Sequence, residues 1–440
     1  MKSGAVSDYD STAAVPEGSL QPAHSNGFWW EVGNGLARTT LVTYLARELG
    51  ADGFVIGLIL ASPHLVGVLR LVSPAILRRF PNYRGFCVTL FAASAAALMA
   101  LPIMAGPGFM PSKSASLGVL VGLWGLWHLL LYLGVIALYA WFGELVLRGA
   151  RGRFLGRRES WRMTGAIIGS VTAGLFALAW TMNQTKETHW LAYGIPAFFG
   201  GVMMLLSNLP LVDLPLPKPR VTELAAADVA EWNILSLLAR PPLRQFLCFA
   251  CWGAFANGVS MAAVGLFAPV VLKVPVLVVL MLESGMRLGQ AGSARWIGSL
   301  LDRWGNRGVL ITSQLIIAGS LLFLLPAGRN SPWWLALVYV AWIAYAGLNI
   351  GLPRTTLQLS SRSDAPSVIA LYYAATGLAV GLGAICGGIA FESVGRNWAW
   401  TIPGSALKLD RFQVFFVVGV LLRMTAVLPL LRWSDPDSAK

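Results

Sequence analysis

Residues Gly298-Ser-Leu-Leu-Asp302-Arg303-Trp304-Gly305-Asn-Arg307 form a short basic turn between two long apolar segments. A second turn of this kind, rich in arginine and glycine, runs from Arg148 to Arg158. Turns of this type connect the crossings of proteins that pass through a bilayer several times. The two turns therefore predict a polytopic membrane protein.

The composition supports this prediction. Of the 440 residues, 56% are hydrophobic and only 12% are charged, whereas a soluble domain has about 25% charged residues. About twelve apolar segments are each long enough to cross a hydrocarbon core of about 30 Å. We therefore predict an all-α membrane protein with twelve transmembrane helices. The segments begin near Phe28, Phe54, Phe86, Leu117, Thr164, Leu191, Gln245, Pro275, Val309, Trp333, Ser367 and Phe412.

The net charge of +13 is explained by topology. Lys and Arg concentrate in the connectors after the even-numbered segments, such as those containing Arg79, Arg153 and Arg303. Because basic residues gather in cytoplasmic connectors, both termini are predicted to be cytoplasmic. The charge then requires only anionic lipids as a partner, and without a binding motif it does not indicate nucleic acid.

The longest polar interruption, residues 213–244, lies near the middle of the chain and divides it into two halves. It opens with three prolines and continues as an amphipathic segment, which predicts a helix on the membrane surface. The halves look like diverged repeats, which is a transporter architecture. The predicted organisation is a disordered cytoplasmic tail (1–27), a six-helix half (28–212), a cytoplasmic linker with an amphipathic helix (213–244), a second six-helix half (245–433) and a cytoplasmic tail (434–440).

The chain resembles the major facilitator superfamily, in its twelve-span form, over residues 28–433. The loop signature of that family, between spans two and three and again between eight and nine, reads Gly-x-x-x-Asp-Arg-x-Gly-x-Arg. The second copy is matched in full, and the turn around Arg153 resembles the family's connector between spans four and five. The matching residues are Gly298, Asp302, Arg303, Gly305 and Arg307.

The resemblance implies two six-helix halves that rock around a central site, with Asp302 and its arginine partners acting as a cytoplasmic gating latch. The first copy of the signature keeps Arg78 but has Leu77 in place of the aspartate, so a weak or absent latch is predicted there. Drug–proton antiporters of the family often carry Gly-Pro-x-x-Gly-Gly in span five. Residues 165–174 contain no proline, which disfavours drug antiport.

Ionisable residues at bilayer depth are costly and usually functional. Arg38 lies near the centre of the first span, seven residues after Glu31 and four after Asn34. At 3.6 residues per turn these three side chains share one helix face. We predict that Arg38 and Asn34 bind substrate and that Glu31 takes part in proton coupling, or else lies at the end of the span for structural reasons.

Glu283 and Arg287 in the eighth span are four residues apart and could pair along one helix face. Alternatively, Arg287 binds an anionic substrate and Glu283 carries a proton. If Arg38 and Arg287 face one cavity, the substrate is predicted to be anionic or rich in hydrogen-bond acceptors, because guanidinium groups bind carboxylate and phosphate in a bidentate manner. Arg423, by contrast, is predicted to extend from its span toward the membrane surface.

Other polar side chains at span depth are packing contacts or cavity ligands, and some of them should line the cavity. The predicted substrate-binding residues of this kind are His128, Tyr132, Asn257, Tyr345, Asn349 and Tyr372.

The sequence has no His-Glu-x-x-His, Gly-x-Ser-x-Gly or phosphate-loop motif, so we predict no enzyme, metal site or cofactor. We predict a monomeric secondary transporter in the plasma membrane or bacterial inner membrane. It would move a small polar or anionic organic solute by alternating access. Transport would be driven by a proton gradient or by the gradient of a substrate. The alternatives are efflux of amphipathic compounds, or a non-transporting membrane sensor of the same fold.

Overall fold

The computed structural model describes residues 17–71, 83–146, 151–216, 234–360, 365–395, 398–401 and 408–433. The predicted tail at 434–440, most of the predicted amphipathic helix of the linker and the degraded first copy of the loop signature lie outside these residues.

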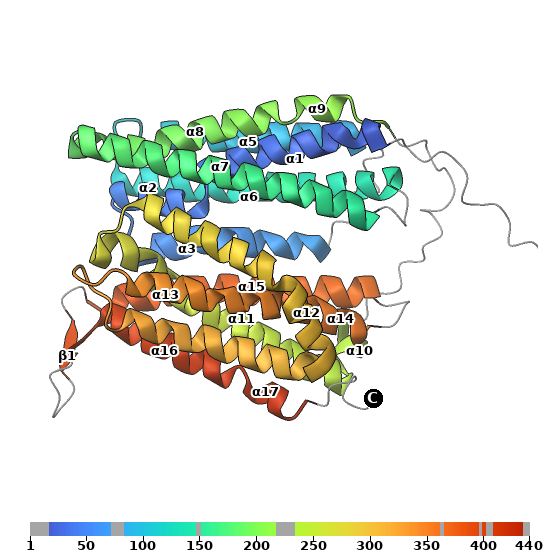
Figure 1. The fold of residues 1–440 in the computed structure, drawn as a ribbon. Coiled ribbons are helices and arrows are strands. Elements are labelled where there is room, and N and C mark those ends of the chain that lie inside the picture. Colours follow the sequence, from blue (N-terminus) through green and yellow to red (C-terminus); the bar gives the residue numbers. More distant parts are fainter. Residues whose placement is uncertain are drawn as a thin grey trace, which may run out of the picture.

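Almost all of the described residues are helical, and they form two bundles that lie side by side (Figure 1). The N bundle contains η1 (Glu17–Leu20), α1 (Gln21–Leu36), α2 (Thr39–Glu48), α3 (Gly53–Val66), η2 (Gly67–Leu71), α5 (Tyr83–Ala105), α6 (Lys113–Leu145), α7 (Arg151–Asn183), η4 (Lys186–Thr188), α8 (Leu191–Leu206) and α9 (Leu209–Val212). The C bundle contains α10 (Ile234–Leu238), α11 (Pro241–Phe267), the π-helical turn η5 (Ala268–Leu272), α12 (Val276–Ser320), η6 (Leu321–Leu324), α13 (Trp334–Ala341), η7 (Trp342–Ala344), α14 (Tyr345–Gln358), α15 (Ala365–Ser393), β1 (Ala399–Thr401), β2 (Lys408–Asp410), α16 (Arg411–Thr425) and α17 (Leu428–Leu431).

Nine helical segments among the described residues are long and apolar enough to cross a membrane. The longest, residues 276–324, bends at Gly305, whose φ of 71° is left-handed and suits a residue without a Cβ. We divide this segment at Gly305 into two crossings. With the shorter apolar helix at 53–69 and the α1–α2 pair, this division gives twelve candidate crossings.

The two ends of the bundles differ. Helix α1 begins and α17 finishes at one end, which we call the terminal end, and β1 lies at the opposite end, which we call the hairpin end (Figure 1). Strands β1 and β2 pair in antiparallel fashion, with Ala399 opposite Asp410. No pattern in the sequence predicted this small hairpin between α15 and α16.

The helical part of the chain begins before residue 28, where the predicted tail ends. Helix α1 begins at Gln21, and His24 and Asn26 are buried. The Asn26 amide donates to the carbonyl oxygen of Ser207 at 2.9 Å and accepts from Arg158 Nη2 at 3.2 Å. The prediction of a disordered tail is therefore wrong for residues 17–27, because Asn26 hydrogen-bonds to neighbouring helices and the His24 ring packs against Phe154.

The first span is interrupted at its centre. Helix α1 ends at Leu36, and α2 begins at Thr39. Arg38 between them has an extended ψ of 149°, so the two helices are separate. The prediction that Glu31, Asn34 and Arg38 share one face of a continuous helix is therefore wrong.

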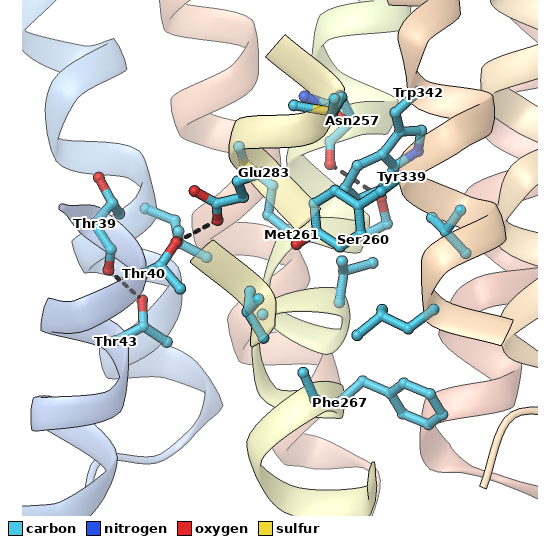
Figure 2. A pocket seen from close by; sticks show the side chains of 18 of the residues that line it. Thr39, Thr40, Thr43, Asn257, Ser260, Met261, Phe267, Glu283, Tyr339 and Trp342 are labelled. Carbon is cyan, nitrogen blue, oxygen red and sulfur yellow. Dashed lines mark hydrogen bonds between the residues drawn. The ribbon is translucent and has the colours of Figure 1, made fainter. Parts of the chain in front are cut away.

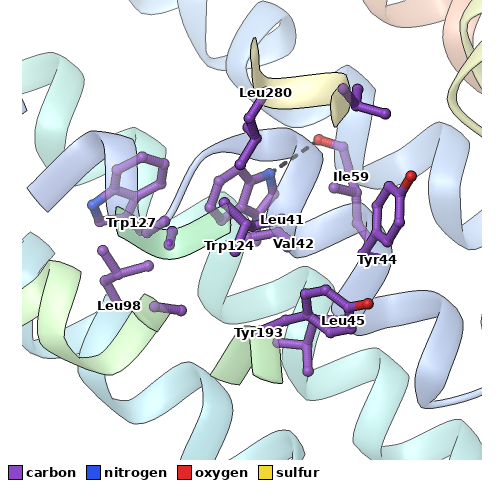
Figure 3. Close-up of a cluster of buried hydrophobic side chains, with 14 of the residues drawn as sticks. Leu41, Val42, Tyr44, Leu45, Ile59, Leu98, Trp124, Trp127, Tyr193 and Leu280 are labelled. Carbon is purple, nitrogen blue, oxygen red and sulfur yellow. Dashed lines mark hydrogen bonds between the residues drawn. The ribbon is translucent and has the colours of Figure 1, made fainter. Parts of the chain in front are cut away.

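The core of the N bundle is a cluster of aromatic and branched side chains (Figure 3). Trp124 on α6 is fully buried and donates its indole N–H to the carbonyl oxygen of Ile59 on α3 at 3.0 Å. Leu41 and Leu45 of α2 pack in this cluster, which continues into the C bundle through residues such as Leu280 of α12 and Phe267 of α11. Because lipid is as apolar as these side chains, close packing and hydrogen bonds hold such a core together.

Glycines allow the two bundles to approach closely. A Cβ on Gly57 of α3 would lie 2.6 Å from the carbonyl oxygen of Ala384 on α15, and one on Gly388 would lie 2.6 Å from that of Gly53. The Gly53 amide also donates to Glu392 Oε2 at 3.0 Å. These contacts join the bundles toward the hairpin end.

We expect Gly57→Val to weaken the contact between the bundles toward the hairpin end, because the added side chain forces α3 away from α15. The measurement uses a Leu60→Cys reporter on the wall of the central cavity, in a protein whose four native cysteines are replaced by alanine. A membrane-impermeant maleimide added from the hairpin side should label the reporter faster in Gly57→Val.

Two control variants separate this effect from misfolding. Gly387→Val places a side chain against Val259 inside the C bundle, and overpacking there should cost about 1–3 kcal/mol of stability without faster labelling. Gly285→Val meets no atom within 4 Å and should change neither property. Equal labelling of Gly57→Val and Gly285→Val would show that α3–α15 contact does not close this end.

Candidate functional site

A cavity of about 390 Å³ lies between the bundles at the level of the α1–α2 break. Its wall is built by the first turn of α2, by α3, and by helices of the C bundle (Figure 2). Much of the wall is apolar, and the charged and hydrogen-bonding side chains form two groups. The charged residues are Arg38, Glu283, Arg287 and Arg423, and the polar residues used below are Thr40, Asn257, Ser260 and Tyr345.

A second cavity of about 300 Å³ shares Arg38 and Arg287 with the first. It continues between α7 and α12, past Glu159 and Ala294, toward the terminal end. At the other side of the larger cavity, the Tyr44 hydroxyl donates to the carbonyl oxygen of Val274 at 3.0 Å. The site is therefore closed toward the hairpin end and continues toward the terminal end.

Arg38 and Glu283 form an ion pair between the bundles. The distance from Arg38 Nη1 to Glu283 Oε2 is 3.5 Å, and the two side chains are 9% and 18% exposed. The Thr40 hydroxyl donates a short hydrogen bond to Glu283 Oε1, and Figure 2 shows Glu283 extended from α12 toward Thr40. The structure thus pairs Glu283 with Arg38, and the alternative pairing with Arg287 along α12 does not occur.

Arg423 forms the second polar group of the cavity wall. The residue is 2% exposed, and its Nη2 donates to Asn257 Oδ1 at 2.6 Å and to Ser260 Oγ at 3.0 Å. The Tyr345 hydroxyl also donates to Asn257 Oδ1, at 3.2 Å. The prediction that Arg423 extends to the membrane surface is wrong, because α16 places its side chain inside the C bundle, where neutral oxygens accept from it.

The larger cavity has an excess of positive charge. Arg38, Arg287 and Arg423 contribute three guanidinium groups, while Glu283 contributes the single carboxylate of its described lining. Nη1 of Arg38 and two nitrogens of Arg423 have no hydrogen-bond acceptor among the described residues. Buried donors of this kind carry a cost unless an acceptor reaches them. The geometry therefore suits a ligand with anionic or strongly accepting groups.

Several predicted site residues lie on the cavities. Asn257 and Tyr345 line the larger cavity, Asn349 lines the smaller one and Arg287 lines both. Three others do not line either cavity: Tyr132, His128, whose ring packs against Trp124 and Trp127, and Tyr372, which stacks on Phe246 in an apolar cluster.

Glu31 and Asn34 belong to a separate network inside the N bundle. Glu31 Oε1 accepts from Arg162 of α7, with the Nε contact at 3.1 Å. The Asn34 amide donates to Glu31 Oε2 at 2.9 Å. Glu31 and Asn34 are absent from the lining of both cavities and tie α1 to α7, while Arg162 also pairs with Glu159 on the wall of the smaller cavity.

The gating-signature residues lie around the bend in α12. Asp302 accepts from Arg354 Nη1 of α14 at 2.7 Å, and Arg307 donates to the carbonyl oxygen of Leu431 at 2.6 Å. Gly305 makes the bend, and Gly298 and Arg303 lie on the helix before it. Arg153 lies in the first turn of α7, but its side chain is outside the described part of the chain.

Two residues of the site, Thr40 and Arg423, were not predicted from the sequence. For Arg423 a signal existed, since it lies near the middle of the apolar segment between Phe412 and Leu431, too deep for an easy reach to the surface. Nothing in the sequence marks Thr40, because its role follows from the helix break beside it.

Neither a protein-family model nor any curated protein sequence matches the chain. Solved structures match it along nearly its whole length. A D-xylose–proton symporter matches with a TM-score of 0.71 and 12% identity, over 97% of this chain and 100% of its own. Nucleoside transporter NupG matches with a TM-score of 0.68 and 15% identity, over 94% and 100%. XylE, the xylose transporter from E. coli in an inward-open conformation, matches with 0.63 and 14%, over 95% and 96%.

This chain has the major facilitator fold. At these identities the likeness establishes the fold, and the predicted fold class is confirmed. The major facilitator fold accounts for a central cavity between two bundles. The fold does not account for the side chains that line the cavity, which are set by this sequence.

We expect Glu31→Gln to lower the stability of the protein by about 1–3 kcal/mol, because it removes a buried partner of the Arg162 guanidinium. Glu159→Gln is the matched control, since Glu159 pairs with the same arginine at 2.7 Å but its side chain is 55% exposed. An exposed pair contributes only about 0–1 kcal/mol. Thermal unfolding of the purified proteins measures both, and an equal effect of the two substitutions would contradict a structural role for the buried pair.

Proposed function

We propose that the protein is a secondary active transporter that carries a small organic anion across a membrane by alternating access. The observation that carries the proposal is the charge of the larger cavity, where three arginines face a single carboxylate. Guanidinium groups at bilayer depth are too costly to be incidental. They also bind carboxylate or phosphate oxygens with well-defined geometry.

The position of the cavity supports alternating access. It lies between bundles whose contact toward the hairpin end includes close glycine backbones, a few hydrogen bonds and packed apolar side chains. Such an interface can separate without unfolding either bundle. With the basic connectors assigned to the cytoplasm, the terminal end is cytoplasmic and the structure is inward-facing. The proposed location is the plasma membrane or bacterial inner membrane, with both termini in the cytoplasm.

The proposed domain division follows the two bundles. Residues 28–212 and 245–433 form the two halves, extended at the N-terminus to Gln21 by α1 and in the second half back to Ile234 by α10 and the start of α11. Residues 213–233 link them. We propose a monomer as the working unit, because residues from both halves of one chain line the cavity.

Glu283 is the proposed coupling group. It is the carboxylate on the described lining of the larger cavity, and its partners Arg38 and Thr40 belong to the other bundle. A proton on Glu283 would weaken this link between the bundles. Glu31, which was also predicted to couple protons, is held by Arg162 in the N bundle, so we propose a structural role for it.

The matched structures bear the names of transporters of nucleosides and of xylose, solutes without carboxylate or phosphate groups. The arginines of this cavity favour a different solute class. Apolar side chains such as Met261 and Met286 also line the cavity, so amphipathic compounds belong in the test.

Uptake into proteoliposomes tests the proposal. The panel contains pairs of organic anions and their neutral amides, with amphipathic cations as a third class. We expect uptake of at least one anion and not of its amide. Arg287→Gln should raise the KM for that anion by about tenfold or more, because a charged hydrogen bond is worth about 1.5–3 kcal/mol.

Arg295→Gln is the control, because Arg295 is an exposed arginine on the same helix that lines neither cavity. It should leave the KM unchanged. Uptake of amphipathic cations alone would favour efflux of such compounds. Binding of an anion without any flux would favour a sensor.

A further inference from the structure

The break in the first span exposes a helix N-terminus to the larger cavity. Arg38, Thr39 and Thr40, which open α2, all line this cavity. The first N–H groups of an α-helix have no acceptor within the helix, and the residue before α2, Arg38, provides no side-chain cap. Helix α2 has 10 residues, enough for the aligned peptide dipoles to favour an anion at this end.

A second observation at this place points independently to an anion. The Arg38 side chain is 9% exposed and lines the cavity, and its Nη1 has no hydrogen-bond acceptor among the described residues. The nearest carboxylate oxygen, Oε2 of Glu283, is 3.5 Å away, which is too long for a strong charged hydrogen bond. An unsatisfied guanidinium N–H therefore lies next to uncapped backbone N–H groups.

The structure also shows what kind of group fits. The carboxylate of Glu283 reaches across from α12 to the start of α2, where it accepts from the Thr40 hydroxyl and faces Arg38. Glu283 thus places negatively charged acceptor oxygens at the start of α2, as a carboxylate or phosphate group of a solute would. Because Glu283 belongs to the C bundle, its place at this site depends on how the two bundles sit together.

We infer that Arg38, Thr40 and the N-terminus of α2 form an anion-binding subsite for which Glu283 and the anionic group of the solute compete. This inference rests on the proposed transport of an organic anion and names the part of the cavity that binds the charged group. When the solute anion takes the subsite, the ion pair between the bundles is broken. Binding is thereby linked to the contact that holds the bundles together.

The competition is tested with purified protein by calorimetric measurement of Kd. The probes are succinate, inorganic phosphate and, as a neutral analogue, succinamide. Glu283→Gln removes the competing charge and keeps the shape of the side chain. We expect it to bind succinate or phosphate about tenfold more tightly than the wild type does, a change of about 1.4 kcal/mol. The affinity for succinamide should not change.

The subsite itself is tested in the Glu283→Gln background, where Thr40 no longer serves the competing carboxylate. Adding Thr40→Val should weaken binding of the anion about tenfold or more, because one hydrogen bond to a charged group is lost. Thr43→Val is the matched control. Thr43 is one turn further along α2, and its hydroxyl donates to the carbonyl oxygen of Thr39 at 2.9 Å, so this change should leave the affinity unaltered.

Unchanged or weaker anion binding in Glu283→Gln would overturn the competition. Equal effects of Thr40→Val and Thr43→Val would overturn the subsite. In both cases the proposed function would stand if the anion still binds and is still transported through a site that depends on Arg287. If no anion binds or crosses the membrane in any folded variant, the proposed function fails and the subsite with it. Glu283→Ala gives the same readout where Glu283→Gln does not yield folded protein.

Discussion

A guanidinium group near the middle of a membrane protein requires acceptors for its N–H groups, because its transfer out of water is costly. In this protein, Arg38 lies at that depth and faces a carboxylate of the opposite bundle, Glu283. Their ion pair joins the bundles at the wall of the larger cavity. The helix break places Arg38 there, and the cavity opens beside it.

The interruption of the first span changes the chemistry of the cavity. A continuous helix would satisfy the backbone N–H groups around Arg38 internally. Because α1 stops at Leu36 and α2 starts at Thr39, a helix N-terminus lies at the cavity wall next to a cationic side chain. The C bundle adds a second cation, Arg423, which neutral oxygens of Asn257 and Ser260 hold without cancelling its charge.

The contacts within a bundle differ from the contacts between the two bundles. Within the N bundle, Trp124 is tied to α3 by a hydrogen bond in a fully packed cluster, and Glu31 is tied to Arg162. Between the bundles, glycines such as Gly57 and Gly388 bring backbones close together, and apolar side chains of both bundles pack beside them. Rigid bundles with a separable interface are the mechanical requirement for exposing one cavity to two sides of a membrane.

The sequence by itself determined the membrane-helical class and the resemblance to the major facilitator fold, because apolar length, basic turns and the Gly298–Arg307 signature are local patterns. It also identified Arg38, Glu283 and Arg287, because a charge inside an apolar segment is conspicuous wherever the segment packs. Tertiary structure alone decided which charges meet. Periodicity along one helix placed Glu31 on the same face as Arg38 and allowed Glu283 to pair with Arg287, whereas the structure pairs Glu31 with Arg162 and Arg38 with Glu283. Such pairs form between helices far apart in sequence, and the break at Arg38 removes the regular helical spacing on which the local argument depended.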